Sequence, residues 1–393
     1  MPKMFREVVI ASAVRTPIGA FLGSLSTVPA PKLGALVIEE ALKRANVDKN
    51  LVNQVIMGCV LPAGVGQAPA RQAAIYAGLP HSVEAYTVNK VCGSGLFAVM
   101  QAANLIALGE AEIIVAGGME NMSLAPYYSN YRQSGYRMGN VQLIDGMVLD
   151  GLTDPYSGKH MGLIGEMCAA EMGITREMQD EYAVKSYYRA AGAQNNGLFK
   201  PEIIGVTIPQ RKGDPKVVEA DEEPGRITTL DFKKMTPAFQ KDGTITAGNA
   251  SKINDGAAAV VVMSAEKARE LGIEPMAVIR DYASHSQLPE QFPIAPTGAI
   301  KKVLDRTDLT TRDIDFWEIN EAFSVVALAN NRLLELDGKN VNVRGGAVAL
   351  GHPIGASGAR ILTTLLHTMK GGDLGCASLC IGGGEAVAMI VEK

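Results

Sequence analysis

The sequence predicts an α/β protein with a largely parallel β-sheet, made of two similar halves with an insert between them. The chain has 393 residues, which suits about two or three domains with a sizeable core. Glycine occupies 42 positions and aromatic residues make up 5%, a composition that favours an α/β protein with many tight turns over a β-sandwich. Short apolar runs alternate with helical patterns near both ends, as expected for parallel strands joined by helices.

The two halves share a unit made of a glycine-rich turn, a helix, a strand and a second glycine-rich turn. In the first copy, Cys92-Gly93-Ser94-Gly95 opens an amphipathic helix, and a strand over 112–116 runs into Gly117-Gly118-Met119-Glu120. The second copy consists of Gly355-Ala356-Ser357-Gly358, a helix, a strand over 377–381 and Gly382-Gly383-Gly384-Glu385. The match extends upstream of each copy. Segment 8–13 in the first half matches segment 276–281 in the second, and segment 54–59 matches segment 315–320. We interpret this match as a duplication rather than a chance similarity of two βαβ pieces.

Between the two copies lies a stretch of different character, from about residue 121 to residue 240. It is rich in glycine, tyrosine, methionine and charge, and it includes the polar run 209–226. Long loops in compact domains are commonly lids or binding loops, so we expect an inserted loop region over the sheets. The predicted division is 1–120 for the N-terminal half, 121–250 for the inserted loop domain with return to the N-terminal half, and 251–393 for the C-terminal half.

Charge and hydropathy argue against several classes of protein. The 37 basic and 41 acidic residues give a net charge of −4 with both signs interleaved, so neither nucleic acid nor a membrane is an expected partner. No apolar run approaches the ~18 residues of a membrane-spanning helix, and the N-terminal apolar run is too short for a signal peptide. Five cysteines without a secretory signal favour reduced thiols, and therefore a cytoplasmic location, over a disulfide framework.

Cys92 lies between a short strand-like segment, 85–88, and a helix, which places its thiol near a helix N-terminus. The helix dipole there lowers a thiol pKa, and Gly93 and Gly95 leave room for a ligand to approach. A thiolate at this position would be a nucleophile for covalent catalysis. The alternative is a small buried residue at a strand–helix junction, a common place for cysteine.

The glycines after Cys92 also fit a second motif. Gly93-Ser94-Gly95-Leu96-Phe97-Ala98 matches the dinucleotide-binding pattern G-x-G-x-x-A, and Glu120 follows the next strand. The match is weak, because the preceding strand is short and polar and a cysteine occupies the tight turn. A nicotinamide enzyme is therefore disfavoured, and so is a serine hydrolase, since no G-x-S-x-G elbow is present.

His352 and Asn320 are further candidates, each in a turn ahead of a helix. His352 is held in a glycine-rich loop, which suits a general base or an oxyanion donor; the alternative is a turn histidine that bonds only backbone. Asn320 follows a strand over 315–319. Its amide could hold a water or an oxyanion there, or it could simply cap the helix that follows.

Cys380 ends an apolar strand just before Gly382-Gly383-Gly384, whose free N–H groups can form an anion nest. A thiol beside such a nest could move a proton next to a developing enolate. The alternative is a buried strand cysteine, which we expect for Cys59, Cys168 and Cys376. A metal site of Cys376, Cys380 and His352 fails for want of a fourth ligand and of a C-x₂-C pair.

Taken together, these segments resemble the thiolase family, and the resemblance runs from Arg15-Thr16-Pro17-Ile18-Gly19 to the C-terminus. Any one block is weak, whereas all five in register are specific. The blocks are Asn89-Lys90-Val91-Cys92-Gly93-Ser94-Gly95, Gly117-Gly118-Met119-Glu120-Asn121-Met122-Ser123, Asn320-Glu321-Ala322-Phe323, Gly351-His352-Pro353-Ile354-Gly355-Ala356-Ser357-Gly358 and Cys380-Ile381-Gly382-Gly383-Gly384.

The resemblance implies a five-layered α-β-α-β-α fold of two similar halves, with an inserted loop domain that binds coenzyme A. It implies that Cys92 takes an acyl group from the first thioester while His352 accepts the thiol proton. Cys380 would remove the α-proton of the second acyl-CoA. The N–H groups of Cys92 and Gly382 would form one oxyanion hole, and His352 with a water held by Asn320 the other.

The resemblance also implies binding residues and an assembly. The positions that match substrate and coenzyme A contacts in the family are His160, Met161, Phe239, Ala247, Ser251, Phe323 and Phe292. A homotetramer built from dimers is expected. The segment 127–138 gives a physical reason, since tyrosine and arginine are enriched at interfaces; its members are Tyr127, Tyr128, Tyr131, Arg132, Tyr136 and Arg137.

Two departures from the family pattern bear on the substrate. Lys252 stands where the family often has a small residue, and Phe292-Pro293 stands where many members have Met-Gly. The Phe-Pro pair resembles the mitochondrial-type acetoacetyl-CoA thiolases, which accept 2-methyl-branched substrates and use a potassium ion. Pro224 stands where that branch has a tyrosine at its ion site, so no metal is expected here.

The expected reaction is therefore the reversible conversion of two acetyl-CoA to acetoacetyl-CoA and CoA, with coenzyme A as substrate or product and no bound cofactor. Three alternatives stay open: a 3-ketoacyl-CoA thiolase of broader chain length or branching, a ketoacyl synthase-like enzyme, and a non-catalytic acyl-CoA-binding protein. Cys380 before Gly382 favours a thiolase over a synthase. The presence of both cysteines with Asn320 and His352 favours an enzyme over a binding protein.

Overall fold

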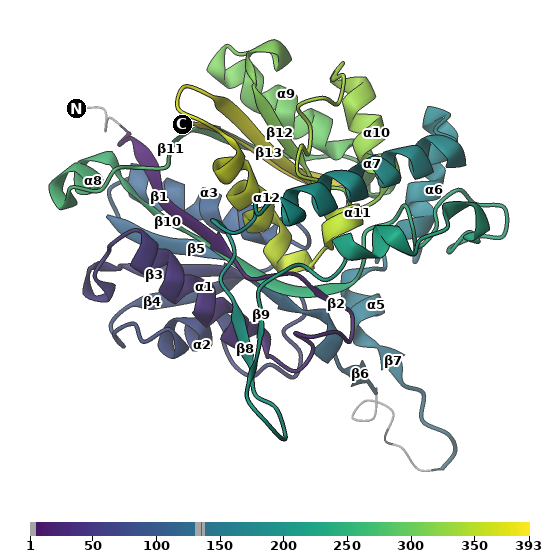
Figure 1. Ribbon diagram of the computed structural model, residues 1–393, viewed down its shortest axis with the longest axis horizontal. Coiled ribbons are helices and arrows are strands. Elements are labelled where there is room, and N and C mark those ends of the chain that lie inside the picture. Colours follow the sequence, from purple (N-terminus) through teal and green to yellow (C-terminus); the bar gives the residue numbers. More distant parts are fainter. Residues whose placement is uncertain (1–4, 130–134, 136–137) are drawn as a thin grey trace.

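A computed structural model describes residues 5–129, 135 and 138–393. Its centre is a ten-stranded sheet in the order β12-β13-β14-β11-β1-β10-β5-β3-β4, with β2 (Gly19–Ala20) paired to β10 (Figure 1). The strands of the first half are β1 (Val8–Arg15), β3 (Gln54–Gly58), β4 (Glu84–Val88), β5 (Ile113–Asn121) and β10 (Asn254–Ser264). Those of the second half are β11 (Ala277–Ser286), β12 (Phe316–Ile319), β13 (Leu374–Ile381) and β14 (Glu385–Glu392).

The pairing pattern repeats between the halves, as the duplication predicts. In the first half, β3 runs parallel to β5, β5 antiparallel to β10, and β10 antiparallel to β1. In the second half, β12, β13, β14 and β11 repeat that series of directions. β1 and β11 then join the halves through Val9 opposite Val278 and Ile10 opposite Ala277.

The expectation of a largely parallel sheet is wrong, because the sheet is mixed. Only the pairs β3–β4, β3–β5 and β12–β13 are parallel among the described strands. β14 follows β13 through a tight turn at residues 382–384, and a short turn can join only antiparallel neighbours. Apolar runs report burial and not strand direction, so the sequence pattern could not distinguish the two cases.

Helices form three layers around the two halves of the sheet. α1 (Ala30–Arg44) and α2 (Pro69–Tyr76) cover the outer face of the first half, and α9 (Ala295–Thr307) covers that of the second. α3 (Ser94–Ala107) and α12 (Ile354–Thr368) pack between the halves and share one apolar core with strands of both. The α-β-α-β-α layering expected from the resemblance is confirmed.

α3 and α12 are the two helices of the duplicated unit, and glycines let their first turns touch. A Cβ on Gly95 would lie 2.8 Å from the backbone nitrogen of Ala359. A Cβ on Gly358 would lie 2.3 Å from the backbone nitrogen of Leu96. Larger residues would push the helices apart, so these glycines fix the distance between the turn before α3 and the turn before α12.

The insert contains helices as well as loops, and its two longest helices pack on the second half. α6 (Met161–Met172) lies against α10 (Ser324–Leu333), and α7 (Arg176–Asn195) lies against α10 and α11 (Ala347–Leu350), as Figure 1 shows. Its other elements are β6 (Tyr127–Tyr128), β7 (Ile144–Asp145), α5 (Gly146–Gly151), β8 (Val206–Ile208) and β9 (Lys216–Val218).

Two findings bear on the organisation of the chain. β10 follows the insert and pairs with β1 and β5, so a division that follows the sheet ends the first half after Ser264. The exact three-part division stays a prediction. Among the described helices, none has the length and apolar character needed to cross a membrane.

Candidate active site

Cys92 lies in the turn between β4 and α3, with its side chain partly buried. The preceding Val91 has φ of +44°, a conformation that a β-branched residue adopts only under strain. Side chains hold this turn: Asn89 Oδ1 accepts from the N–H of Val91, and Ser94 Oγ donates to the Val91 carbonyl oxygen at 2.6 Å. The strained turn therefore presents the Cys92 sulfur at the start of α3.

The electrostatics of Cys92 differ from the expectation of a lowered thiol pKa. Burial raises the pKa of the Cys92 thiol to about 11, against the lowering effect of hydrogen bonds from the backbone N–H groups of Gly382 and of Cys92 itself. The Cys92 side chain packs against two apolar clusters, one containing Ile354 and the other Ile381. The effect of this apolar cover on the thiol pKa is larger than that of the helix N-terminus. A thiol in this setting needs a neighbouring base to ionise at neutral pH.

His352 lies between α11 and α12 and is 6% exposed. Its Nδ1 is 2.6 Å from Ser357 Oγ, and Ser357 Oγ donates its only proton to the Pro353 carbonyl oxygen at 2.9 Å. This network assigns the imidazole proton to Nδ1, which donates to Ser357 Oγ. Burial, reinforced by Arg360, lowers the pKa of His352 to about 3, so the ring is neutral.

The other ring nitrogen of His352, Nε2, is buried and has no hydrogen-bond partner in the described part of the chain. In the tautomer fixed by Ser357 it carries a lone pair and no proton. A buried, unpartnered acceptor costs free energy and persists mainly where it has a function. His352 Nε2 is thus free to accept a proton from a group placed beside it.

Cys380 lies in β13, is 1% exposed, and precedes the turn that carries Gly382. Burial raises the pKa of its thiol far above the usual range, and a negative charge on Cys92 raises it further. The sulfur of Cys380 therefore lies close enough to that of Cys92 for a thiolate on Cys92 to oppose the ionisation of Cys380. Gly382 donates its N–H toward Cys92, so the turn after β13 reaches the first thiol.

Asn320 follows β12, and it does not cap the next helix. α10 begins at Ser324 with Phe323 as its N-cap and without a side-chain cap. Asn320 is 1% exposed instead, with its Oδ1 accepting from Arg360 at 3.3 Å and its Nδ2 lying 3.5 Å from His352 Nδ1. The amide is thus held beside the imidazole, and the capping alternative is wrong.

Glu120 links the segment after β3 to the first turn of α12, a role that the sequence did not reveal. Its buried carboxylate accepts the N–H groups of Val60, Leu61 and Gly355 at 2.9–3.1 Å. Burial raises its pKa to about 7 despite these bonds. A carboxylate so occupied cannot bind a ribose, which removes the dinucleotide interpretation. Its counterpart in the second half, Glu385, lies at the surface and pairs with Lys90.

Two cavities lie near this centre, although the side chains of Cys92, His352, Cys380 and Asn320 line neither of them. The first, of about 880 Å³, is lined by residues that flank Cys92, including Val91, Met161 and Gly382. The second, of about 430 Å³, is lined by residues of the insert and the following loop, among them Arg226, Phe239, Ala247, Ser251 and Lys252.

Three aromatic rings pack together beside the second cavity. The rings of His160 and Phe239 stack at 4.8 Å between centroids, and Phe239 meets Phe323 edge-to-face at 6.1 Å. Met161, Phe239, Phe323 and the 2%-exposed Phe292 pack in one cluster with Cys380. Of the predicted binding residues, Met161 lines the first cavity, and Phe239, Ala247 and Ser251 line the second. Phe292 and Phe323 lie in the cluster, and His160 stacks on Phe239.

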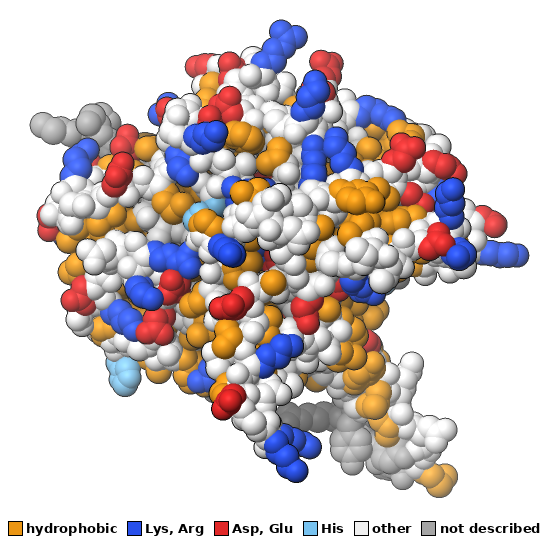
Figure 2. Space-filling view, in the orientation of Figure 1, with side chains coloured by type: hydrophobic (Ala, Val, Ile, Leu, Met, Phe, Trp, Pro, Cys, Tyr) orange, Lys and Arg blue, Asp and Glu red, His pale blue; other side chains and the backbone are white. Residues whose placement is uncertain are grey.

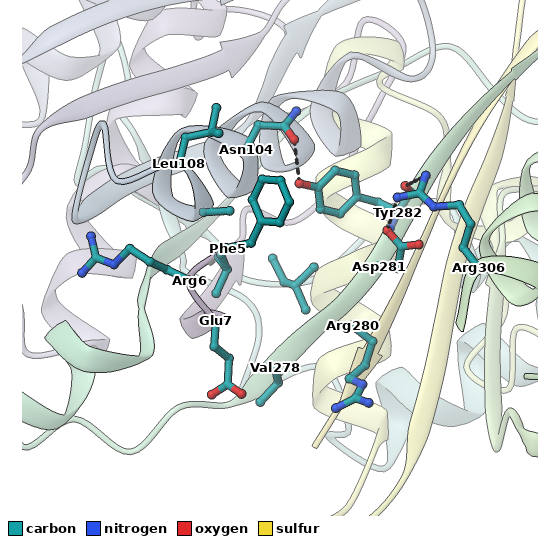
Figure 3. A pocket seen from close by; sticks show the side chains of 13 residues that line it. Phe5, Arg6, Glu7, Asn104, Leu108, Val278, Arg280, Asp281, Tyr282 and Arg306 are labelled. Carbon is teal, nitrogen blue, oxygen red and sulfur yellow. Dashed lines mark hydrogen bonds and ion pairs between the residues drawn. The ribbon is translucent and has the colours of Figure 1, made fainter. Parts of the chain in front are cut away.

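Among the other cysteines, one expectation is wrong. Cys59 and Cys376 are buried beside or within strands as expected, whereas Cys168 is buried in the helix α6. A third cavity, of about 550 Å³, is lined by Phe5, Asn104, Tyr282 and Arg306 (Figure 3). Asn104 lies near the far end of α3, about 15 Å of helix from Ser94, so this cavity is separate from the cysteines.

Comparison with known proteins agrees with this geometry. Residues 8–266 match the thiolase N-terminal domain, and residues 273–393 match the thiolase C-terminal domain. An acetyl-CoA acetyltransferase of Cupriavidus necator is 56% identical over 390 residues, covering 98% of this chain and 99% of that protein. A probable acetyl-CoA acyltransferase of Staphylococcus aureus is 51% identical over 389 residues, again covering 98% and 99%.

Solved structures match equally well along the chain. The Bacillus anthracis acetyl-CoA acetyltransferase superposes with a TM-score of 0.95 at 41% identity, covering 99% of both chains. A thiolase from Ascaris suum in complex with coenzyme A superposes with a TM-score of 0.93 at 44% identity, covering 99% of this chain and all of that one. With both family domains matched over nearly its whole length, the chain belongs to the thiolase family.

Proposed function

We propose that this thiolase is an acetyl-CoA acetyltransferase, which converts two acetyl-CoA to acetoacetyl-CoA and free CoA and also catalyses the reverse thiolysis. The observation that carries the proposal is the free Nε2 of His352, buried in the turn next to the one that presents Cys92. A neutral imidazole with its proton on Nδ1 can take the proton of a thiol whose pKa is otherwise about 11. The names of the relatives support the same substrate.

The first half-reaction transfers an acetyl group to Cys92. The Cys92 sulfur attacks the thioester carbonyl carbon while its proton passes to His352 Nε2. The carbonyl oxygen becomes an oxyanion, which the N–H groups of Cys92 and Gly382 stabilise; both already point toward the sulfur in the resting site. When the carbon–sulfur bond to CoA breaks, His352 returns the proton to the leaving thiolate, and free CoA departs.

The second half-reaction forms the carbon–carbon bond. Cys380 passes its thiol proton to His352 Nε2 and, as the thiolate, removes the α-proton of a second acetyl-CoA. The enolate oxygen is then held by the Nε2–H group of His352 and a water on Asn320. The enolate carbon attacks the acetyl group on Cys92, whose sulfur leaves as a thiolate and takes the proton from His352 Nε2, while Cys380 keeps the α-proton. Acylated Cys92 cannot become a thiolate, so no negative charge on the first sulfur opposes the ionisation of Cys380 in this step.

The two cavities divide the substrate between them. The coenzyme A portion would occupy the cavity lined by Phe239, Ala247 and Ser251, with Phe323 beside the pantetheine. His160 and Met161 would contact the acyl group and the end of the pantetheine, and Phe292 would limit the acyl pocket from the cluster around Cys380. Coenzyme A is then substrate and product, and the reaction requires no other bound cofactor.

Thiolysis is the direct test of this function. The enzyme is mixed with acetoacetyl-CoA and free CoA, and the loss of the thioester enolate absorbance is followed, with Cys92→Ala as the control. Turnover that Cys92→Ala abolishes is the expected result, and binding without turnover would identify a non-catalytic acyl-CoA-binding protein. A panel of longer and branched 3-ketoacyl-CoA substrates tests the broader-specificity alternative, which predicts a higher kcat/KM for a longer or branched member.

The assembly belongs to the same proposal, as a homotetramer. Figure 2 shows hydrophobic side chains gathered over α5, β6 and β7, where Tyr127 and Leu143 are each 63% exposed. Exposed apolar surface of this kind marks protein interfaces. Tyr131, Arg132, Tyr136 and Arg137 of the predicted interface segment lie outside the described residues. Light scattering at micromolar protein should return four chain masses, and a monomer would refute the assembly.

A cytoplasmic location is the last part of the proposal. All five cysteines are unpaired in the structure, and the chemistry requires two of them as thiols. Free thiols persist in a reducing compartment.

A further inference from the structure

Lys252 has its ammonium group turned into the protein, against two backbone carbonyl groups. Its Nζ donates to the Ala250 carbonyl oxygen at 2.9 Å and to the Val348 carbonyl oxygen at 3.1 Å. The face of the Tyr187 ring lies 5.2 Å from the same atom. Two carbonyl oxygens and a ring face form a binding site for a compact cation, here filled by a side chain.

The charges around this ammonium group are already paired with other groups. Glu223 forms an ion pair with Arg226 at 2.9 Å. Glu321 accepts hydrogen bonds from Tyr182, Ser186, Asn342 and the N–H of Val348. Burial lowers the pKa of Lys252 to about 8, while Glu223 and Glu321 act in the opposite direction and Arg226 adds to the lowering. Lys252 thus binds mainly through the carbonyl groups and the ring.

The two carbonyl groups belong to segments with different tasks. Ala250 and Ser251 line the 430 Å³ cavity, and the N–H of Ser251 donates to Ala322. Val348 lies in α11, which ends at Leu350, directly before the loop that carries His352. A second bond ties the same segments together, since the N–H of His352 donates to Asn254 Oδ1 at 3.0 Å.

We propose that Lys252 acts as a tethered monovalent cation, which holds the cavity wall at Ser251 in register with the His352 loop. It is a positioning residue, and the inference rests on the roles proposed above for Ser251 and His352. A thioester bound at Ser251 must present its carbonyl to Cys92 while His352 keeps its orientation. If the bond to Val348 is lost, α11 and the wall can shift relative to each other, and a misplacement of about 1 Å can slow a reaction about 10²-fold.

The test replaces the tether and supplies the cation separately. Lys252→Met keeps the apolar stem and removes the charge, leaving the carbonyl groups and the ring face vacant. We expect kcat for thiolysis to fall about 10²-fold, and ammonium chloride to restore part of it in a saturable manner. Tetramethylammonium chloride at equal ionic strength should restore none, because it cannot donate to carbonyl groups. Lys301→Met removes an exposed lysine on α9 and is the matched control, with no expected change.

A binding readout keeps this test separate from the proposed function. Ammonium should raise the melting temperature of Lys252→Met more than tetramethylammonium does, and should not do so for the wild type. Inactive wild type would refute the proposed function, while the melting data would still report on the cation site. If Lys252→Met does not fold, Lys252→Ala, which also leaves both carbonyl groups vacant, should show the same ammonium response. Wild-type kcat in either variant, or equal effects of the two salts, would overturn the proposal.

Discussion

Ser357 offers a specific test of how the histidine is prepared for catalysis. Its hydroxyl donates to the Pro353 carbonyl oxygen at 2.9 Å and accepts from His352 Nδ1 at 2.6 Å. In Ser357→Ala the Nδ1–H loses its acceptor inside the protein, and the ring can exchange its proton between nitrogens. The tautomer with the proton on Nε2 cannot take a proton from Cys92, so turnover should fall.

The magnitude follows from the cost of an unpaired buried polar group. A buried donor without a partner costs about 1–3 kcal/mol. If that cost moves the population toward the wrong tautomer, kcat should fall by about 5–150-fold. The KM for CoA should change little, because Ser357 lies on α12 and does not line the 430 Å³ cavity.

The matched control is Thr363→Val on the same helix. Thr363 is also fully buried, and its hydroxyl donates to a helix carbonyl, that of Ala359, at 2.8 Å without touching the histidine. Both variants lose a buried hydroxyl, but only Ser357→Ala should lose turnover in a steady-state thiolysis assay. Equal kcat in the two variants would show that Ser357 does not set the tautomer of His352.

Three further predictions concern the same centre. Cys380→Ser should slow turnover about 10²–10⁴-fold because it weakens general acid–base catalysis, yet Cys92 should still be acetylated in a pulse; a variant that cannot be acetylated contradicts this division of labour. Alkylation of Cys92 by iodoacetamide should accelerate about tenfold per pH unit above pH 7, because thiolate forms as pH rises toward the thiol pKa of about 11; a plateau by pH 8 would mean a lowered pKa. Phe292→Met with Pro293→Gly should change the kcat/KM ratio of 2-methylacetoacetyl-CoA to acetoacetyl-CoA, since one methylene in a pocket is worth about 1–3 kcal/mol; an unchanged ratio would place both residues outside the acyl site.

The sequence revealed the positions of the main reactive groups well, because Cys92 and His352 lie in glycine-rich turns and Cys380 lies just before one. The duplicated unit placed Cys92 and the loop of His352 at equivalent turns, and the packing of α3 on α12 brings those turns together. Such turns are visible locally, since glycine marks the tight backbone and periodic apolar residues mark the helix that follows.

Features set by long-range packing were not visible in the sequence. The pKa of Cys92 is raised because residues far along the chain cover its sulfur, whereas the sequence shows only the helix start beside it. The partnership of Ser357 with His352 depends on how the loop enters α12. Likewise, the direction of β10 relative to β1 and β5 is decided by the route of the insert and not by the composition of the strand.

The most direct test of the proposed chemistry is to locate the acetyl group after a brief pulse of acetyl-CoA. The enzyme is quenched in acid, digested and measured by mass spectrometry, with Cys92→Ala treated in parallel. We predict one acetyl adduct, on the peptide that contains Cys92, and none in the variant. An adduct on the Cys380 peptide, or an adduct that persists in Cys92→Ala, would contradict the assignment of Cys92 as the nucleophile.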